Sequence, residues 1–315
     1  MRIRARESFS RKFQMLTGSC NMIYSCSFNF LFIFSTCSAI FTTMETFIDL
    51  CNSVLPLHKL LWVFLCLGAA WLVESVIPLS QAQYNRRKHA GVNFVFFAFS
   101  MVINLVLGLT VVAGFEYLSV QEFGLFYLLE LPLWGQLVLT ILFLDLVAQY
   151  FVHYLLHKVR WMWRLHVVHH SDTRVDATTG VRHHPVDFFI RESFALVAIL
   201  LLGAPLAFYV FYRLLSILFT FWTHANIKLP GKLDYLLSWI IVTPNMHKFH
   251  HHHELPWTDS NFGNVLSVWD RLFGTLVYED PEDVMFGLDV VDETKDEDVL
   301  YQLTVPFSSD PLRNE

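Results

Sequence analysis

Three long apolar runs limit what this chain can fold into. They lie at residues 60–79, 92–115 and 133–152 and contain few charged side chains. An α-helix needs about 20 apolar residues to cross the hydrocarbon core of a bilayer, and each run reaches that length. Only 16% of all residues are charged, whereas roughly a quarter are charged in soluble domains. We therefore expect an integral membrane protein made of helices.

A fourth apolar run, residues 194–222, is longer than the others and is interrupted by Gly203 and Pro205. Glycine commonly ends a helix, and proline cannot continue one. This run therefore predicts two short helices or a bent hairpin rather than one straight span.

The distribution of charge predicts an orientation. Lysine and arginine gather at residues 85–89 and 157–164, whereas residues 116–130 carry three acids and no base. Basic loops tend to stay in the cytoplasm. If the 194–222 hairpin enters the membrane and returns, the chain on both sides of it lies in the cytoplasm.

These criteria divide the chain into four stretches. Residues 1–50 form an N-terminal basic and apolar extension or extra span, and residues 51–152 form transmembrane helices. Residues 153–275 form a histidine-rich catalytic region that includes the 194–222 hairpin, and residues 276–315 form an acidic, solvated cytosolic tail. The tail is the main source of the net charge of −6. No basic stripe of the kind that binds nucleic acid is present, so no nucleic-acid partner is expected.

Histidine is the strongest chemical signal. All of the fifteen histidines except His58 and His89 lie between residues 153 and 253, in the groups "HYLLH", "HVVHH", "HHP", "THAN" and "HKFHHHH". On a helix, positions i, i+3 and i+4 share one face, so H-x-x-x-H directs two imidazoles the same way and H-x-x-H-H directs three. These groups supply more rings than one tetrahedral metal needs. We infer two metal ions in a histidine-rich cage.

Each group has a simpler explanation when it is taken alone. A single H-x-x-x-H is as often a surface pair as a metal site. Three such groups in order along about one hundred residues argue for a metal centre. In the last group the spacing selects His247, His250 and His251, which leaves His252 and His253 outside. One of the neighbours His183 and His184 is expected to point away.

Metal-bound histidines usually donate their second N–H to a carboxylate or carbonyl. Asp145 lies two helical turns before His153 and is a candidate for this role. The others are Asp172, Asn226, Asn261 and Asp270. The alternative roles are helix capping for Asp172 and turn formation around Asn261 and Asp270.

Three segments extend the pattern beyond the histidines. They read "WRLHVVHHSDTRVDATTGVRHHP", "FWTHANIKLP" and "VTPNMHKFHHHHELPWTDSNFGNVLSVWDRLFGT" and begin at residues 163, 221 and 242. Together they resemble the fatty acid hydroxylase and sterol desaturase superfamily, nearest to its sterol desaturase-like branch. The resemblance covers residues 80–280 and not the first fifty.

The resemblance implies an all-α fold, a polytopic transmembrane helical bundle with a cytosolic helical cap that holds a dinuclear metal site. It implies ten ligands, with His184 matching the histidine of the family's R-x-H-P motif. They are His153, His157, His166, His169, His170, His184, His224, His247, His250 and His251.

The resemblance also implies the chemistry. Imidazole accepts several metals, and the family points to two iron ions with O2 as co-substrate; zinc could replace iron in recombinant protein. The expected reaction is hydroxylation or desaturation of a membrane lipid such as a sterol, a fatty acyl chain or an ether lipid. The sequence shows no heme-binding or flavin-binding motif, so a separate electron-transfer protein is expected. The oligomeric state is not indicated.

Two alternatives come from other functional classes. One is a membrane metal-ion transporter, and the other is a non-catalytic zinc-binding membrane protein. Transporters place their ligands near the bilayer midplane on broken helices. Most of these histidines instead follow the apolar runs, which favours the enzyme. The protease motif H-E-x-x-H is absent.

Overall fold

The computed structural model describes residues 43–80, 84–279 and 284–308. The chain divides into two compact units, Met1–Phe47 and Ile48–Glu315, and the account below concerns the second. The prediction of an extension or extra span over residues 1–50 lies almost entirely outside the described residues. The described part contains helices and loops, and its only β-structure is two isolated bridges.

Four described helical segments are long and apolar enough to cross a membrane. They are Pro56–Val76 (α3), Arg86–Leu128, Leu133–Lys158 and Leu206–His224 (α10). Exposed leucines such as Leu72 and Leu109, with 68% and 70% of their surface accessible, cover the outer faces of α3 and the second segment. A helix that is apolar on its outward side as well as its inward side suits lipid rather than water. This supports a multi-pass membrane protein.

The second segment consists of α4 (Arg86–Val120) and the short α5 (Leu125–Leu128). The third consists of α6 (Leu133–Leu144), η1 (Asp145–Phe151) and α7 (Val152–Lys158), which follow one another without a break. η1 is a π-helix, a rare form that occurs frequently at functional sites. It changes the rotation of the helix just before His153 and His157, and so decides which way these histidines face.

The fourth apolar run forms the hairpin that the sequence predicts. α9 (Pro185–Leu202) ends at Gly203, and α10 begins after Pro205. Gly203 has φ +64°, and a Cβ atom there would lie 2.6 Å from the carbonyl oxygen of Phe123. The turn therefore needs glycine for its backbone conformation and for the close approach of the α4–α5 loop. Ala195 and Ala198 on α9 are small, buried members of the core between α4, α6, α9 and α10.

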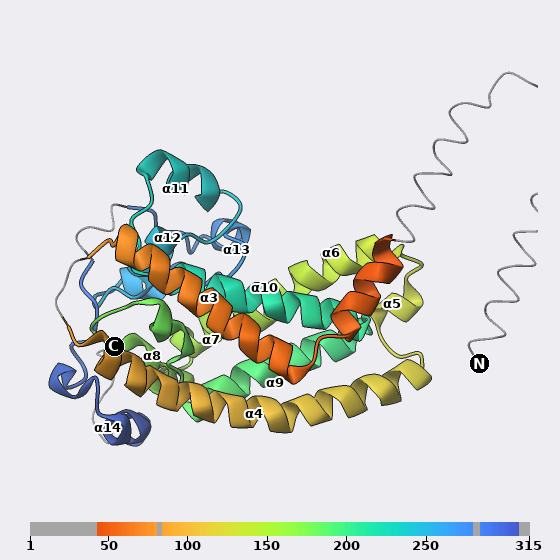
Figure 1. The fold of residues 1–315 in the computed structure, drawn as a ribbon, viewed down its shortest axis with the longest axis horizontal. Helices are drawn as coiled ribbons and strands as arrows, with labels where there is room; N and C mark the ends of the chain where they lie inside the picture. Colours follow the sequence, from red (N-terminus) through yellow and green to blue (C-terminus); the bar gives the residue numbers. More distant parts are fainter. Residues whose placement is uncertain (1–42, 81–83, 280–283, 309–315) are drawn as a thin grey trace, which may run out of the picture. The chain divides into compact units, whose positions relative to one another are not determined.

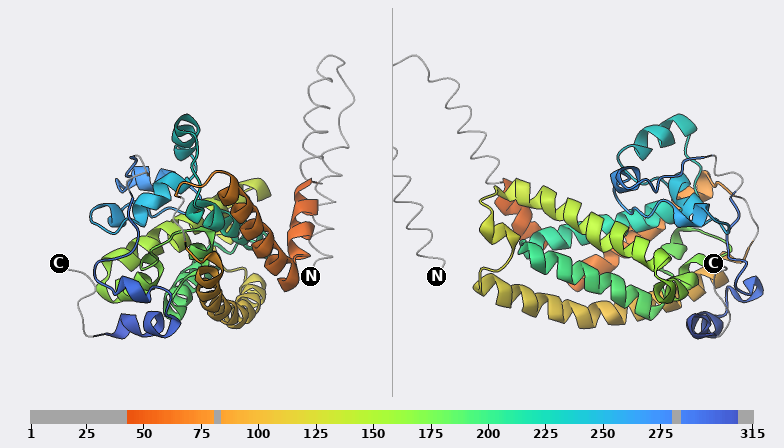
Figure 2. Two further views of the ribbon diagram at one scale, coloured as in Figure 1. Left: turned by 60° about the vertical axis from the view of Figure 1, so that its left-hand side comes forward. Right: turned by 180° about the vertical axis from the view of Figure 1, so that it is seen from behind.

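The remaining elements gather at one end of the bundle (Figure 1). They are α8 (Arg160–His170), η2 (Ala177–Val181), α11 (Gly231–Ser238), α12 (Pro244–His250), η3 (Trp257–Asp259), α13 (Val268–Leu272), η5 (Glu293–Lys295), α14 (Val299–Thr304) and η6 (Val305–Phe307). The reverse view shows the long helices running side by side away from this cap (Figure 2).

The acidic C-terminal segment differs from the solvated tail that the sequence suggests. Leu288 and Val305 are buried against Val167 and Val168 of α8, and Gln302 is fully buried, accepting a hydrogen bond from Ser171. The acids around these positions hid an apolar pattern that is long enough to pack. Residues 288–305 are therefore part of the cap.

Candidate metal centre

Nine histidines converge where the bundle meets the cap. α7 supplies two, α8 supplies three, α10 ends on one, and α12 with the residue after it supplies three. They form two groups, in each of which one ligand atom per residue lies within 4.8 Å of all the others. The first group is His153, His157, His166, His170 and His250, and the second is His169, His224, His247 and His251. All nine are buried.

The imidazoles meet through their Nε2 atoms. The Nε2–Nε2 distance is 3.1 Å between His153 and His166, 3.1 Å between His169 and His224, and 3.0 Å between His224 and His247. Such contacts between neutral rings need a proton on one of the two nitrogens if they are hydrogen bonds. The Nδ1 atoms show where the proton is.

The Nδ1 atoms of three of these rings face carbonyl oxygens, which accept a hydrogen bond and cannot donate one. Those of His153 and His169 lie 2.9 and 3.2 Å from the carbonyl oxygens of Phe262 and Arg182. That of His224 lies 2.7 Å from the carbonyl oxygen of Thr220. Each of these three rings, when neutral, therefore carries its proton on Nδ1, and its Nε2 presents a bare lone pair. Lone pairs 3 Å apart repel unless a cation lies between them, so this donor set fits bound metal ions.

Further nitrogens support this fit. Both ring nitrogens of His170 and of His251, and Nε2 of His250, are buried without a hydrogen-bond partner among the described residues. A buried polar atom without a partner costs free energy, so most such atoms in folded proteins are satisfied. A metal ion would satisfy these.

Side chains and carbonyls orient the rings from behind. His166 Nδ1 lies 2.9 Å from Asp187 Oδ2, and His157 Nδ1 lies 3.3 Å from Asp259 Oδ1. His250 Nδ1 lies 2.7 Å from the carbonyl oxygen of Ser260. A carboxylate or carbonyl behind a histidine fixes its tautomer and makes it a stronger ligand.

The environment keeps the imidazoles neutral. Burial is the main cause that moves the pKa of His166, His169 and His170 well below the ordinary value. Neighbouring histidines lower the pKa further in all three, and Arg191 does so in His166 and His169. Burial likewise lowers the pKa of His247, His250 and His251. Only the neutral ring has a lone pair for a metal.

Asp187 stays ionised at the edge of the site. Burial alone would raise its pKa, but Arg191, whose Nε donates to Asp187 Oδ1 at 3.0 Å, and His183 lower it to about 2. His166 and His183 thus share one buried carboxylate.

The structure differs from the prediction for the pair His183 and His184. His184 lies outside both groups, where its Nδ1 accepts from the N–H of Val186 and caps α9. His183 faces the site instead, with its ring stacked on that of His169 at 4.6 Å and its Nδ1 3.4 Å from Asp187. The pair precedes the first turn of α9, so helical spacing could not choose between them.

The sequence suggested five residues that would orient the imidazole rings, but their side chains bond to loop segments and not to the rings. In the described residues, none of them is hydrogen-bonded to one of the nine histidines. Asp145 accepts from Trp269 Nε1 and from the N–H of Leu266. Asp172 accepts from Thr179, and Asn226 pairs with Ser80.

Asn261 and Asp270 act on the site through the backbone. Asn261, at φ +51°, donates to the carbonyl of Met246, and Asp270 accepts from the N–H groups of Phe262 and Gly263. They fix the loop whose carbonyls at Ser260 and Phe262 hold His250 and His153. The orienting carboxylates that sequence reasoning missed are Asp187 and Asp259. The H-x-x-x-D spacing from His183 to Asp187 was the available signal for the first.

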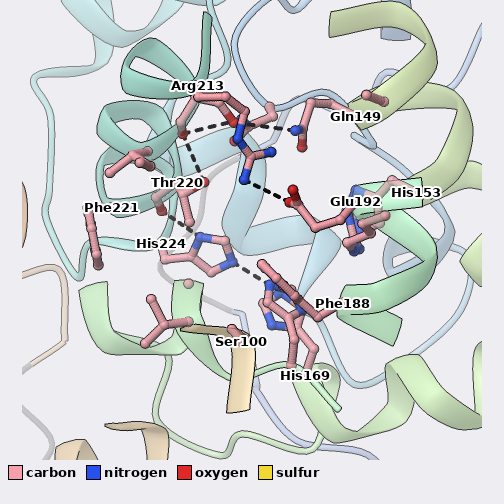
Figure 3. Close-up of a pocket in the computed structure, with 18 of the residues that line it drawn as sticks. Ser100, Gln149, His153, His169, Phe188, Glu192, Arg213, Thr220, Phe221 and His224 are labelled. Carbon is pink, nitrogen blue, oxygen red and sulfur yellow. Dashed lines mark hydrogen bonds and ion pairs between the residues drawn. The ribbon is translucent and has the colours of Figure 1, made fainter. Parts of the chain in front are cut away.

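A cavity of about 180 Å³ opens on the membrane side of the histidines. His153, His169, His183, His224 and His247 line it at one end, and α3, α4, α9 and α10 supply much of the rest. Figure 3 shows His224 and His169 side by side on this wall.

Comparison with known proteins agrees with this geometry. The sequence model described as "Fatty acid hydroxylase" matches residues 137–275, from within α6 to just after α13, and this range holds all nine histidines. Residues 137–275 therefore match the fatty acid hydroxylase family. This agrees with the resemblance seen in its histidine motifs.

Several curated members of the superfamily are similar to this chain. The ornithine lipid hydroxylase OlsE of Rhizobium tropici is 29% identical over 56% of this chain and 52% of its own length. The alkylglycerol monooxygenase of Xenopus tropicalis is 33% identical over 48% of this chain and 32% of its own, and that of Homo sapiens is 31% identical over 44% and 30%. The chain thus spans about half of the first of these relatives and less than a third of the other two. No solved structure matches it.

Proposed function

We propose that this chain is a membrane oxidoreductase that uses two iron ions and O2 to hydroxylate a C–H bond of a lipid, with desaturation as the other outcome. The observation that carries the proposal is the inward-facing set of nine buried imidazoles, five in one group and four in the other. Two of the relatives are an ornithine lipid hydroxylase and an alkylglycerol monooxygenase, and these names support oxygen insertion into a lipid.

The groups of five and four would each hold one ion. Bound iron would supply the activation of O2, which no side chain can provide. Asp187, Asp259 and the carbonyls of Phe262, Arg182, Thr220 and Ser260 would keep the rings in one tautomer and one orientation. Electrons would come from a separate electron-transfer protein.

The cavity would receive the substrate. It opens among the membrane helices beneath the histidines, so a molecule dissolved in lipid reaches it more easily than a soluble metabolite. At about 180 Å³ it is smaller than the roughly 300–1,000 Å³ of sites that enclose a whole small molecule. It would hold one segment of a lipid, with the remainder in the bilayer. From the basic residues that flank α4 and α7, the metal side would be cytoplasmic.

Metal analysis and O2 consumption test the proposal together. Purified protein in lipid nanodiscs is expected to bind two irons and to consume O2 only when reductant and lipid are both present, giving a lipid product heavier by one oxygen. Transport of metal across liposomes without O2 consumption would favour the transporter. Stable zinc with neither activity would favour a zinc-binding protein.

A further inference from the structure

A buried ion pair faces the same cavity. Arg213 Nη2 donates to Glu192 Oε1 at 2.7 Å, and both side chains are mostly buried, although α10 is a candidate membrane span. Charges inside a membrane bundle are costly and usually mark a functional site. An ion pair is a poor choice for stability alone, since replacing such a pair by apolar residues is often neutral or stabilising. We therefore expect this ion pair to function in ligand binding.

The pair begins a polar stripe that leads to the histidines. Arg213, Ser216, Thr220 and His224 are spaced by three, four and four residues along α10, which puts them on one face of the helix, and all four line the cavity. Figure 3 shows Arg213, Thr220 and His224 along one side of the pocket, with Glu192 joined to Arg213 by a dashed line.

Amides from two other elements complete the polar wall. Gln149 Nε2 and Asn264 Nδ2 both donate to Ser216 Oγ, at 3.3 and 3.0 Å. Because that oxygen already accepts two hydrogen bonds, the Ser216 hydroxyl is left to act as a donor. The lining also includes apolar side chains, among them Phe97, Val181 and Ile217.

This arrangement selects a kind of ligand. A guanidinium has five N–H donors, more than one carboxylate oxygen uses, and a carboxylate has a second oxygen that accepts. The pair can therefore donate to and accept from one hydroxyl group. The pair has no net charge, and Arg191, which also lines the cavity, is already paired with Asp187. A carboxylate or ammonium group of a ligand would therefore lack a free counter-charge at this pair.

We infer that Glu192 and Arg213 form a subsite that binds an uncharged hydroxyl group of a long-chain lipid and holds its alkyl segment against the histidine wall. The inference rests on the proposed function only in taking this bound lipid as the substrate. Binding itself needs no turnover and is tested separately.

Photo-crosslinking with two matched probes tests the subsite. The probes are a sixteen-carbon primary alcohol and the alkane of equal length, each with the same mid-chain diazirine, offered to full-length protein in phosphatidylcholine nanodiscs. The unchanged protein is expected to label with the alcohol at least about tenfold more than with the alkane, because a polar site left unpaired rejects the analogue without the hydroxyl. The labelled peptides should include residues of α9 or α10.

The double variant Glu192→Leu with Arg213→Met removes the subsite and leaves no buried charge unpaired. It should reduce the alcohol preference to about twofold or less, with unchanged metal content and yield. A purely structural ion pair would leave the preference intact. The matched control, Lys88→Met with Glu297→Leu, removes a more accessible ion pair of the same length, 2.7 Å, away from the cavity and should keep the preference.

Three results would overturn the inference. They are equal labelling by alcohol and alkane in the unchanged protein, a tenfold preference that survives in the double variant, and labelling by the matching sixteen-carbon fatty acid as strong as that by the alcohol. Selective alcohol labelling by iron-loaded protein that consumes no O2 would support the subsite and count against the proposed function instead.

Discussion

Two substitutions of Asp187 test how strongly an orienting carboxylate contributes to metal binding by the histidines. Its carboxylate is fully buried and bonded to His166 Nδ1 at 2.9 Å and to Arg191 Nε at 3.0 Å. Asp187→Asn keeps an amide oxygen that can accept from His166 but loses the charge. Asp187→Ala removes the acceptor as well.

The magnitudes follow from these contacts. Loss of an orienting partner typically costs about 10–100-fold in metal affinity. We expect Asp187→Asn to weaken metal binding about tenfold and Asp187→Ala about one hundredfold. A hundredfold loss of affinity corresponds to roughly 2.7 kcal/mol, at about 1.36 kcal/mol per factor of ten. Either change also leaves the mostly buried Arg191 unpaired, so the thermal midpoint should fall.

Competition with a calibrated chelator measures metal affinity, and thermal unfolding of the metal-free protein measures the separate effect on stability. Asp292→Asn is the matched control, because Asp292 pairs with Lys295 at an exposed site away from the histidines. If Asp187→Ala bound metal within twofold of the unchanged protein, the orienting role of Asp187 would be refuted.

Other substitutions test other parts of the account. His250→Ala or His170→Ala should abolish lipid oxidation and lower metal content while membrane insertion persists; full activity with a complete metal complement would contradict the site. His183→Ala should reduce activity more than His184→Ala, which should cost about 1 kcal/mol of stability as a lost helix cap; the reverse order in paired activity and unfolding assays would restore the motif-based assignment. Gly203→Ala should destabilise the hairpin by about 1–3 kcal/mol because of its positive φ, and an unchanged unfolding midpoint would refute this.

The sequence was sufficient to predict features that depend on a single helix, such as which residues share a face and where a helix ends. His166, His169 and His170 lie on one helix, so the i, i+3, i+4 rule predicts their common face, and the structure brings them together. Gly203 and Pro205 likewise predicted the break between α9 and α10, because each residue restricts its own backbone.

Contacts between distant segments were beyond the same reasoning. The carbonyls of Phe262 and Ser260 orient His153 and His250, and a carbonyl is present at every position, so no residue type marks it. Asp145 shares a helix with His153, but the π-helix between them alters the expected facing and the carboxylate binds the loop at Leu266 instead. Glu192 and Arg213 lie on separate helices, and only their packing makes them a pair.

Metal stoichiometry combined with X-ray absorption tests the central claim most directly. We predict two metal ions per chain after exhaustive dialysis, with nitrogen or oxygen neighbours only, at about 2.0–2.1 Å in a zinc-loaded sample. The double variant His169→Ala with His247→Ala should bind one metal ion or none. Fewer than one ion per chain in the unchanged protein, or sulfur among the neighbours, would contradict a centre held by these nine imidazoles.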